Sequence, residues 1–134
     1  MSRKTLVAAG ATAVVTVTIG FGLGGAYAYA RDKMPKPQKG TIWAVVESDG
    51  TLVRHSKNIE SALRIAPGQY RVFAKGDVRS CAYEATAGDA GLGVPPRTYA
   101  DVAQGLFDTR STFVETYDST GTRVDSDFYL AILC

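Results

Sequence analysis

Histidine is nearly absent from this sequence, and its scarcity removes most of the chemistry that a hydrolytic enzyme would need. His55 is the only histidine, and it stands between cations in Arg54-His55-Ser56-Lys57. A catalytic triad requires a histidine that a carboxylate orients beside a nucleophile. The glycine-flanked serine of the hydrolase elbow is also missing. The sequence therefore predicts a solvated loop histidine, no catalytic residue and a protein that is not an enzyme.

Ligands for metals and cofactors are equally few. Once two cysteines pair with each other, one histidine cannot assemble a zinc site. Asp118, Asp125 and Asp127 are close in sequence, but their spacing does not match an EF-hand loop, and aspartates at hairpin ends usually serve turns. The glycine-rich stretch 88–93 is followed by no lysine, so it predicts a flexible loop. We expect no cofactor and no metal.

The whole chain has a formal net charge of +2, but the domain itself has no excess of basic residues. Residues 1–30 contain two basic residues, and residues 31–39 contain four basic residues and one acidic residue. The remainder contains nine basic and twelve acidic residues. A mildly acidic domain lacks the basic surface that binds phosphate backbones, so we expect no nucleic-acid partner.

The N-terminus differs from the rest of the chain. Arg3 and Lys4 precede an uncharged run, Thr5–Ala30, which ends in small residues at alternate positions. This pattern predicts a secretory signal peptide over residues 1–30, cleaved after Ala28 or Ala30. An uncleaved anchor is the alternative, since the run is long enough to cross a bilayer, although the basic residues that follow it oppose that orientation. We expect a secreted, extracellular protein without membrane contact after cleavage.

Cysteine occurs twice, as Cys81 and Cys134. Both lie in the predicted exported domain, where an oxidising environment makes a disulfide the default. Because the loop that it closes is long, such a bond stabilises the domain by about 4 kcal/mol. Two buried free thiols are the alternative.

Apolar stripes of helical period are absent after residue 40, and short β-branched and aromatic runs occur instead. Turn signals separate these runs every eight to twelve residues, roughly the spacing of a sandwich. Residues 41–134 are therefore expected to form an all-β domain, a single small antiparallel β-sandwich closed by one disulfide. The expected strands are Thr41–Glu47, Thr51–Arg54, Ser61–Ile65, Gln69–Ala74, Ser80–Ala87, Tyr99–Ala103, Ser111–Tyr117 and Asp127–Leu133.

Residues 31–40, RDKMPKPQKG, form an extended basic arm between signal peptide and domain. Pro35 and Pro37 restrict the residues before them to extended conformations. Extended peptides fit clefts and exposed sheet edges, so we expect a partner-binding arm. Its contact residues would be Lys33, Met34, Pro35, Lys36 and Pro37. A solvated spacer is the alternative.

Several motifs resemble a family of small secreted actinobacterial β-sandwich proteins over residues 41–134. They are Trp43-Ala44-Val45-Val46, Asp49-Gly50-Thr51, Cys81-Ala82-Tyr83, Phe113-Val114-Glu115-Thr116 and the terminal Leu130-Ala131-Ile132-Leu133-Cys134. The resemblance implies a bridge between the two cysteines. The order of signal peptide, basic strap and sandwich is also similar to the adaptor subunit of umbrella-shaped secreted toxin particles. That likeness implies a strap that docks into a lectin-bearing, protease-like subunit and a sandwich that holds a large scaffold subunit, although no strap motif matches residue by residue.

Taken together, these features predict a secreted, non-enzymatic adaptor or binding module that bridges protein partners through its sandwich and arm. Two alternatives remain open. The first is an inhibitor of trypsin-like proteases that inserts Lys33 or Lys36. The second is a carbohydrate- or cell-wall-binding sandwich that uses the exposed members of a set of aromatic residues, namely Trp43, Tyr70, Tyr83, Tyr99, Tyr117 and Tyr129.

Overall fold

The computed structural model describes residues 35–91 and 93–134. The predicted signal peptide (residues 1–30) and the first four residues of the predicted arm, 31–34, lie outside the described residues. The described arm, residues 35–40, belongs to the same compact unit as the domain, which extends to Cys134.

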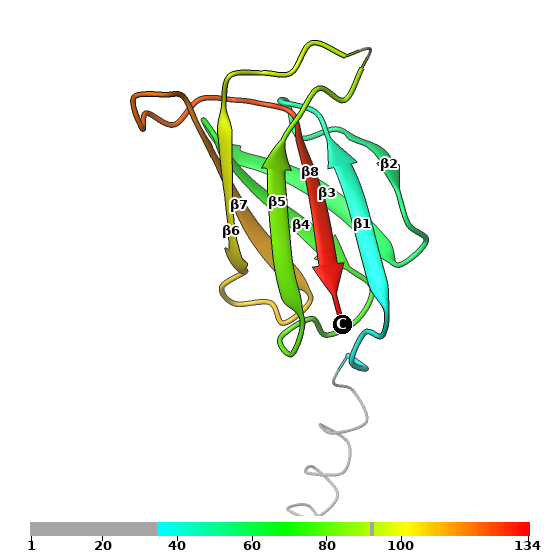
Figure 1. Ribbon diagram of the computed structural model, residues 1–134. Helices are drawn as coiled ribbons and strands as arrows, with labels where there is room; N and C mark the ends of the chain where they lie inside the picture. Colours follow the sequence, from blue (N-terminus) through cyan, green and yellow to red (C-terminus); the bar gives the residue numbers. More distant parts are fainter. Residues whose placement is uncertain (1–34, 92) are drawn as a thin grey trace, which may run out of the picture. The chain divides into compact units, whose positions relative to one another are not determined.

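Eight strands form two four-stranded antiparallel sheets that pack face to face (Figure 1). One sheet has the order β2-β1-β8-β5 and the other β3-β4-β7-β6. The predicted all-β sandwich is therefore confirmed. The strands are β1 (Thr41–Val46), β2 (Leu52–His55), β3 (Ile59–Ala66), β4 (Gln69–Ala74), β5 (Ala82–Ala87), β6 (Tyr99–Gln104), β7 (Ser111–Tyr117) and β8 (Phe128–Leu133).

Strand alternation places the core between the sheets. Along β4, Tyr70, Val72 and Ala74 are fully buried, while the residues between them point outward and are half-buried. Tyr70 lies opposite Val114 of β7, and its ring centroid is 5.0 Å from that of Phe128 on β8. The other buried strand residues that complete the core are Ile42, Ala44, Val46, Ile59, Leu130 and Ile132.

Two glycines allow turns to pack directly on neighbouring strands. Gly50 has a φ of +93°, and a Cβ there would lie 2.6 Å from the backbone nitrogen of Arg64. Gly68 has a φ of +65°, and its Cβ would lie 2.7 Å from the carbonyl oxygen of Thr116. A residue with a side chain would be strained in both backbone conformation and space. The Asp49-Gly50 turn therefore also fixes the packing of one sheet on the other, whereas the Pro67-Gly68 turn packs against β7 of its own sheet.

The loops gather at two opposite ends of the sandwich, which are lower and upper in Figure 1. We call the lower one the arm end and the upper one the turn end. The arm end comprises residues 35–40, 56–58, 75–81, 105–110 and 134, and the turn end comprises residues 47–51, 67–68, 88–91, 93–98 and 118–127.

Candidate interaction surfaces

The described part of the arm is bound to the domain. The carbonyl oxygen of Lys36 accepts a hydrogen bond from the Asp77 amide (2.8 Å), and the Gln38 amide donates to the Asp77 carbonyl oxygen (2.9 Å). Pro37 and Asp77 thereby form an isolated parallel β-bridge. Gly76 makes this approach possible, because a Cβ there would lie 2.4 Å from the Lys36 carbonyl oxygen. The side chains of Lys36 and Pro37 are exposed, so a partner can reach them.

Of the five predicted arm contacts, three are described by the structure. Pro35 is half-buried beside Lys36 and Pro37. Lys33 and Met34 lie outside the described residues. No sequence pattern indicated the bridge to Asp77, because this bridge depends on a glycine that is nearly forty residues away. Partner binding by the arm stays a prediction.

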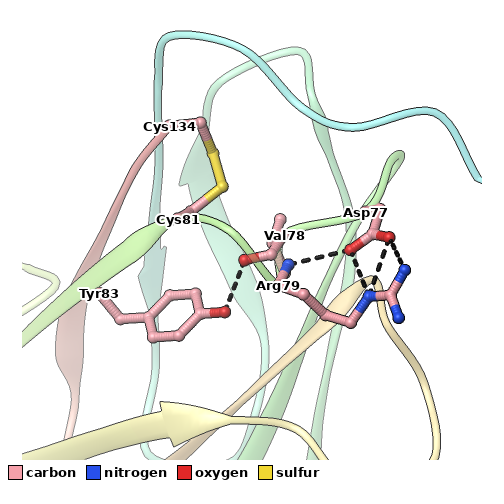
Figure 2. Close-up of a disulfide and its surroundings, with 6 residues drawn as sticks. All are labelled: Asp77, Val78, Arg79, Cys81, Tyr83 and Cys134. Carbon is pink, nitrogen blue, oxygen red and sulfur yellow. Dashed lines mark hydrogen bonds and ion pairs between the residues drawn. A yellow bond between two sulfur atoms is a disulfide. The ribbon is translucent and has the colours of Figure 1, made fainter.

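Asp77 holds this region through its side chain as well (Figure 2). Its carboxylate accepts hydrogen bonds from the Arg79 amide (2.9 Å) and from Nη2 of the Arg79 guanidinium (2.5 Å). The Arg79 guanidinium keeps the pKa of Asp77 below its ordinary value. Close by, the Tyr83 hydroxyl donates to the Val78 carbonyl oxygen (2.6 Å), and burial raises the pKa of Tyr83. The segment 77–83 is thus fixed by its own polar side chains.

The disulfide between Cys81 and Cys134 lies in the same region (Figure 2). The predicted pairing is confirmed, and the two cysteines are 53 residues apart in the sequence. The Cys134 amide donates to the Gly40 carbonyl oxygen (2.9 Å). Three segments that are far apart in sequence, the arm, the β4–β5 loop and the last residue, therefore meet at the arm end.

The loop between β6 and β7 presents two large apolar side chains to solvent at this end. Phe107 is 100% exposed and Leu106 is 69% exposed. Phe107 has a φ of +68°, and it is the one non-glycine residue with positive φ among those the structure describes. No strand was expected over residues 105–110. Two large apolar residues inside a turn were the available signal, but their exposure could not be inferred from it.

Hydrogen bonds within this loop hold the exposed pair in place. The Asp108 carboxylate accepts from the Arg110 amide (2.9 Å) and from the Arg110 guanidinium (3.0 Å), and that guanidinium keeps the pKa of Asp108 below its ordinary value. The Ser111 amide donates to the Asp108 carbonyl oxygen (3.1 Å), and Val78 donates to Thr109 (2.9 Å). The loop is ordered, yet neither Leu106 nor Phe107 is covered by it.

The carboxylates of the turn end hold turns together. Asp127 accepts from the Ser48 amide (2.7 Å) and the Ala90 amide (3.0 Å). Asp125 accepts from the Arg64 guanidinium (2.9 Å) and the Gly68 amide (2.8 Å). Both carboxylates also line an open hollow of about 270 Å³. The hydrogen bonds of Asp125 and Asp127 to the domain explain why these two carboxylates lie at the hollow.

The three aspartates weighed as calcium ligands are thus placed in separate structural roles. Asp118 caps its own turn through the Thr120 hydroxyl (2.6 Å) and the Thr122 amide (3.1 Å). Asp125 and Asp127 bond to distant segments, as above. Within residues 35–91 and 93–134, no three histidine, cysteine, aspartate or glutamate side chains are grouped so that they could hold a metal ion.

The outer surface of the sheet β3-β4-β7-β6 carries several large apolar side chains, and we call it the apolar sheet face. Leu63 and Tyr99, on the two edge strands, are 56% and 64% exposed. Between them, the outward-facing Phe73 and Phe113 are half-buried. Phe113 also borders a shallow hollow of about 230 Å³ beside β6. The face consists of Leu63, Ile65, Phe73, Tyr99 and Phe113.

The six aromatic residues considered for carbohydrate binding separate into three groups. Tyr70 is buried in the core, and Tyr83 and Tyr117 are half-buried. Trp43 and Tyr129 are exposed on the outer surface of the other sheet, and Tyr99 is exposed on the apolar sheet face. Trp43 pairs with Ala131 and Val45 pairs with Tyr129, so the two aromatic side chains are diagonal neighbours on adjacent strands.

His55 is exposed, as expected, but it is the last residue of β2 and does not lie in a loop. Its Nδ1 atom is 2.8 Å from the carbonyl oxygen of Ser56. The preceding turn, Asp49-Gly50, brings β2 back along β1 as far as the pair Ala44–His55. The strand therefore has the expected length of four residues but is shifted by one position, from Thr51–Arg54 to Leu52–His55.

No protein-family model, curated protein or solved structure matches this chain. The resemblance to the actinobacterial sandwich family therefore stays a prediction, as does the likeness to the adaptor of toxin particles. In the part of the chain that the structure describes, no helix is both long and apolar enough to span a bilayer.

Proposed function

We propose that this protein is a secreted, non-enzymatic binding module that acts as an adaptor between protein partners. The apolar sheet face is the observation that carries the proposal. Leu63 and Tyr99 expose large side chains at its two edges, and the rings of Phe73 and Phe113 lie between them. Isolated exposed apolar residues are ordinary on protein surfaces, but a contiguous patch is typical of a protein-binding surface.

The arrangement of this face suits a protein partner. Half-buried aromatic rings are rigid, so they lose little conformational entropy when a partner covers them. Polar side chains occupy part of the same surface: Arg71 lies opposite both Leu63 and Phe113, and Glu115 pairs with Asp101. Apolar side chains interspersed with polar groups are a common composition of a protein interface.

The arm would supply the second contact of the adaptor. Residues 31–34 precede the point at which Lys36 is bound to Asp77, and they contain Arg31, Lys33 and Met34. In the assembly suggested by the toxin-particle likeness, this segment would enter a lectin-bearing, protease-like subunit. The apolar sheet face would then hold a large scaffold subunit.

Affinity purification from native culture supernatant, followed by mass spectrometry, tests the proposal. The double variant Leu63→Thr, Tyr99→Thr should lose one partner, since threonine keeps strand propensity but removes the large side chain. Deletion of residues 31–34 should lose a second partner. Val53→Thr is the matched control, because Val53 is 40% exposed on β2, in the other sheet, and it should retain both. Recovery of the protein alone in every form would reject the adaptor function.

Inhibition of a trypsin-like protease through Lys36 is less favoured by the geometry. The Lys36 carbonyl, which a protease would have to attack, accepts a hydrogen bond from the Asp77 amide. Pro37 follows at once. Insertion of Lys36 would therefore require release of the arm from the domain. The Gly76→Ala variant, which forces that release, should increase inhibition if Lys36 is the inserted residue.

Carbohydrate binding has a specific observation in its favour, the exposed neighbours Trp43 and Tyr129. Two aromatic faces at diagonal positions can stack on successive sugar rings. Pull-down on insoluble polysaccharide should then be lost in Trp43→Ala and kept in Tyr99→Ala, which lies on the opposite sheet. Equal retention of both variants would exclude Trp43 as the contact.

A further inference from the structure

The exposed apolar pair at the arm end, Leu106 and Phe107, departs from two general preferences, one for backbone conformation and one for the burial of large apolar side chains. A left-handed backbone disfavours any residue with a Cβ, and glycine or asparagine usually occupies such positions. Phe107 adopts this conformation at φ +68° and leaves its whole side chain in water, beside the exposed Leu106. Nothing in the domain is stabilised by this arrangement, and such exceptions concentrate at functional sites.

Charge at the same end has one predominant sign. The arm end contains six basic residues and two acidic ones, Asp77 and Asp108. Each acidic residue is bonded to an arginine of the same end. The other four basic residues are exposed lysines for which the described residues supply no ion pair. They are Lys36, Lys39, Lys57 and Lys75.

The chain also enters the domain at this end. Lys36 and Gln38 are bonded to Asp77, so only residues 31–34 separate Pro35 from the uncharged run that ends at Ala30. Four residues span at most about 14 Å, whatever their conformation. The segment that precedes the domain in sequence is therefore joined to it at the arm end.

We infer that the arm end docks on a bilayer that contains anionic phospholipid. Leu106 and Phe107 enter the boundary between headgroups and acyl chains, and the four lysines bind headgroup phosphates. Apolar insertion and electrostatic attraction are each weak alone, but they act together on a membrane surface. A projecting apolar pair suits a fluid surface, because it sinks in without a preformed pocket.

This inference goes beyond the proposed function, which needs only the apolar sheet face and the arm. It also departs from the expectation, drawn from the sequence, that membrane contact ends with cleavage. The reason is the exposure of Leu106 and Phe107, which the sequence did not reveal.

Co-sedimentation of the mature protein, starting at Arg31, with lipid vesicles tests the inference. Vesicles of phosphatidylcholine mixed with phosphatidylglycerol should sediment the protein, and vesicles of phosphatidylcholine alone should bind it far less. Phe107→Asn should weaken binding about tenfold, because it removes the ring. Asparagine tolerates the left-handed backbone, so the variant should keep its fold. Lys57→Gln and Lys75→Gln should each weaken binding about fivefold.

Val53→Thr is the matched control and should bind vesicles as the unmodified protein does. Phe107→Gly serves as a second variant if Phe107→Asn does not fold. The inference is wrong if neither vesicle sediments the protein, if Phe107→Asn binds undiminished, or if neutral vesicles bind equally well. If the unmodified protein binds no vesicles, and Phe107→Asn no longer captures a protein that the unmodified form captures from culture supernatant, then the β6–β7 loop is a protein contact. That outcome would reject lipid docking and leave the adaptor function standing.

Discussion

The two ends of the sandwich differ in how they use their polar and apolar side chains. At the turn end, six acidic residues outnumber two basic ones, and Asp118, Asp125 and Asp127 accept hydrogen bonds from backbone amides of the domain itself. At the arm end, six basic residues outnumber two acidic ones, and the side chains of the exposed lysines form no ion pair with the described residues.

Each end is also held together by a different kind of interaction. The turn end depends on carboxylates and on the Tyr70 hydroxyl, which are individually weak and sensitive to pH. The arm end has the Cys81–Cys134 disulfide and the backbone pairing at Asp77 in addition to its own carboxylate–arginine pairs. Leu106, Phe107 and the lysine side chains take no part in these interactions and remain exposed. Both ends therefore contribute to stability, and the arm end combines exposed large apolar side chains with an excess of basic residues.

The largest expected effect comes from breaking the covalent link at the arm end. Cys134→Ser should lower the free energy of unfolding by about 4 kcal/mol, because the long closed loop no longer restricts the unfolded chain. The melting temperature should fall by roughly 20 °C. Thermal unfolding followed by circular dichroism measures this change. The double variant Cys81→Ser, Cys134→Ser should match the single one, and an unchanged melting temperature after reduction would contradict the prediction.

A smaller loss is expected when the turn end is loosened by Tyr70→Phe. The buried hydroxyl donates to the Ser48 carbonyl oxygen (2.8 Å) and accepts from the Ser126 amide (3.2 Å). Its removal leaves both groups without this partner and should cost about 2 kcal/mol. Urea denaturation measures the loss. Tyr99→Phe removes an exposed hydroxyl and should have no effect; equal losses in the two variants would show that burial is not the cause.

Acid should weaken the turn end through Asp125. The Arg64 guanidinium and the Gly68 amide keep the pKa of Asp125 below its ordinary value. The carboxylate therefore contributes stability that is present above the unfolded-state pKa of about 4 and is lost as the pH falls through the lower folded-state value.

Melting temperatures measured from neutral pH to about pH 2 should show this dependence. The difference between the unmodified protein and Asp125→Asn should be largest near neutrality and should close below about pH 4. Asp101→Asn is the control, since the described residues supply no ion pair to this exposed carboxylate. If the difference in melting temperature between the unmodified protein and Asp125→Asn stayed constant with pH, ionisation of Asp125 would be excluded as its cause.

The smallest expected change in stability is a gain, at the tip of the arm end. Phe107→Asn places a residue that tolerates positive φ at φ +68°, so the domain should become more stable by up to about 1 kcal/mol. Urea denaturation again gives the value. A clear loss of stability would show that the Phe107 ring supports the domain, and it would weaken the assignment of this loop to binding.

Local sequence pattern was sufficient for most of the strands. The alternation in Gln69–Ala74 gave β4 with its buried face, and Ser111–Tyr117 gave β7 with both ends correct. It was less accurate for β3, which was expected over Ser61–Ile65 but extends from Ile59 to Ala66. Pairing with β4 supplies the extra length, although the register shifts at both ends of the pair. The ends of such an edge strand are decided by pairing with its neighbour, which the pattern within one strand does not reveal.

The candidate surfaces were predicted less well. The arm was recognised from its prolines and lysines, but its bridge to Asp77 was not, because that contact depends on the close approach allowed by Gly76. The apolar sheet face was also missed. Leu63 and Tyr99 lie on strands whose side chains alternate between two faces. Alternation identifies the residues of each face, but where both faces carry apolar residues it does not show which face is buried.

The sequence by itself determined the all-β class, the two turns at Asp49-Gly50 and Pro67-Gly68 and the pairing of Cys81 with Cys134. These depend on local backbone preference or on there being only two cysteines in the chain. Tertiary structure decided which carboxylates serve the domain, where the arm lies, and that Leu106 and Phe107 remain exposed. Each of these depends on segments brought together from distant parts of the chain, and that proximity exists only once the two sheets have packed.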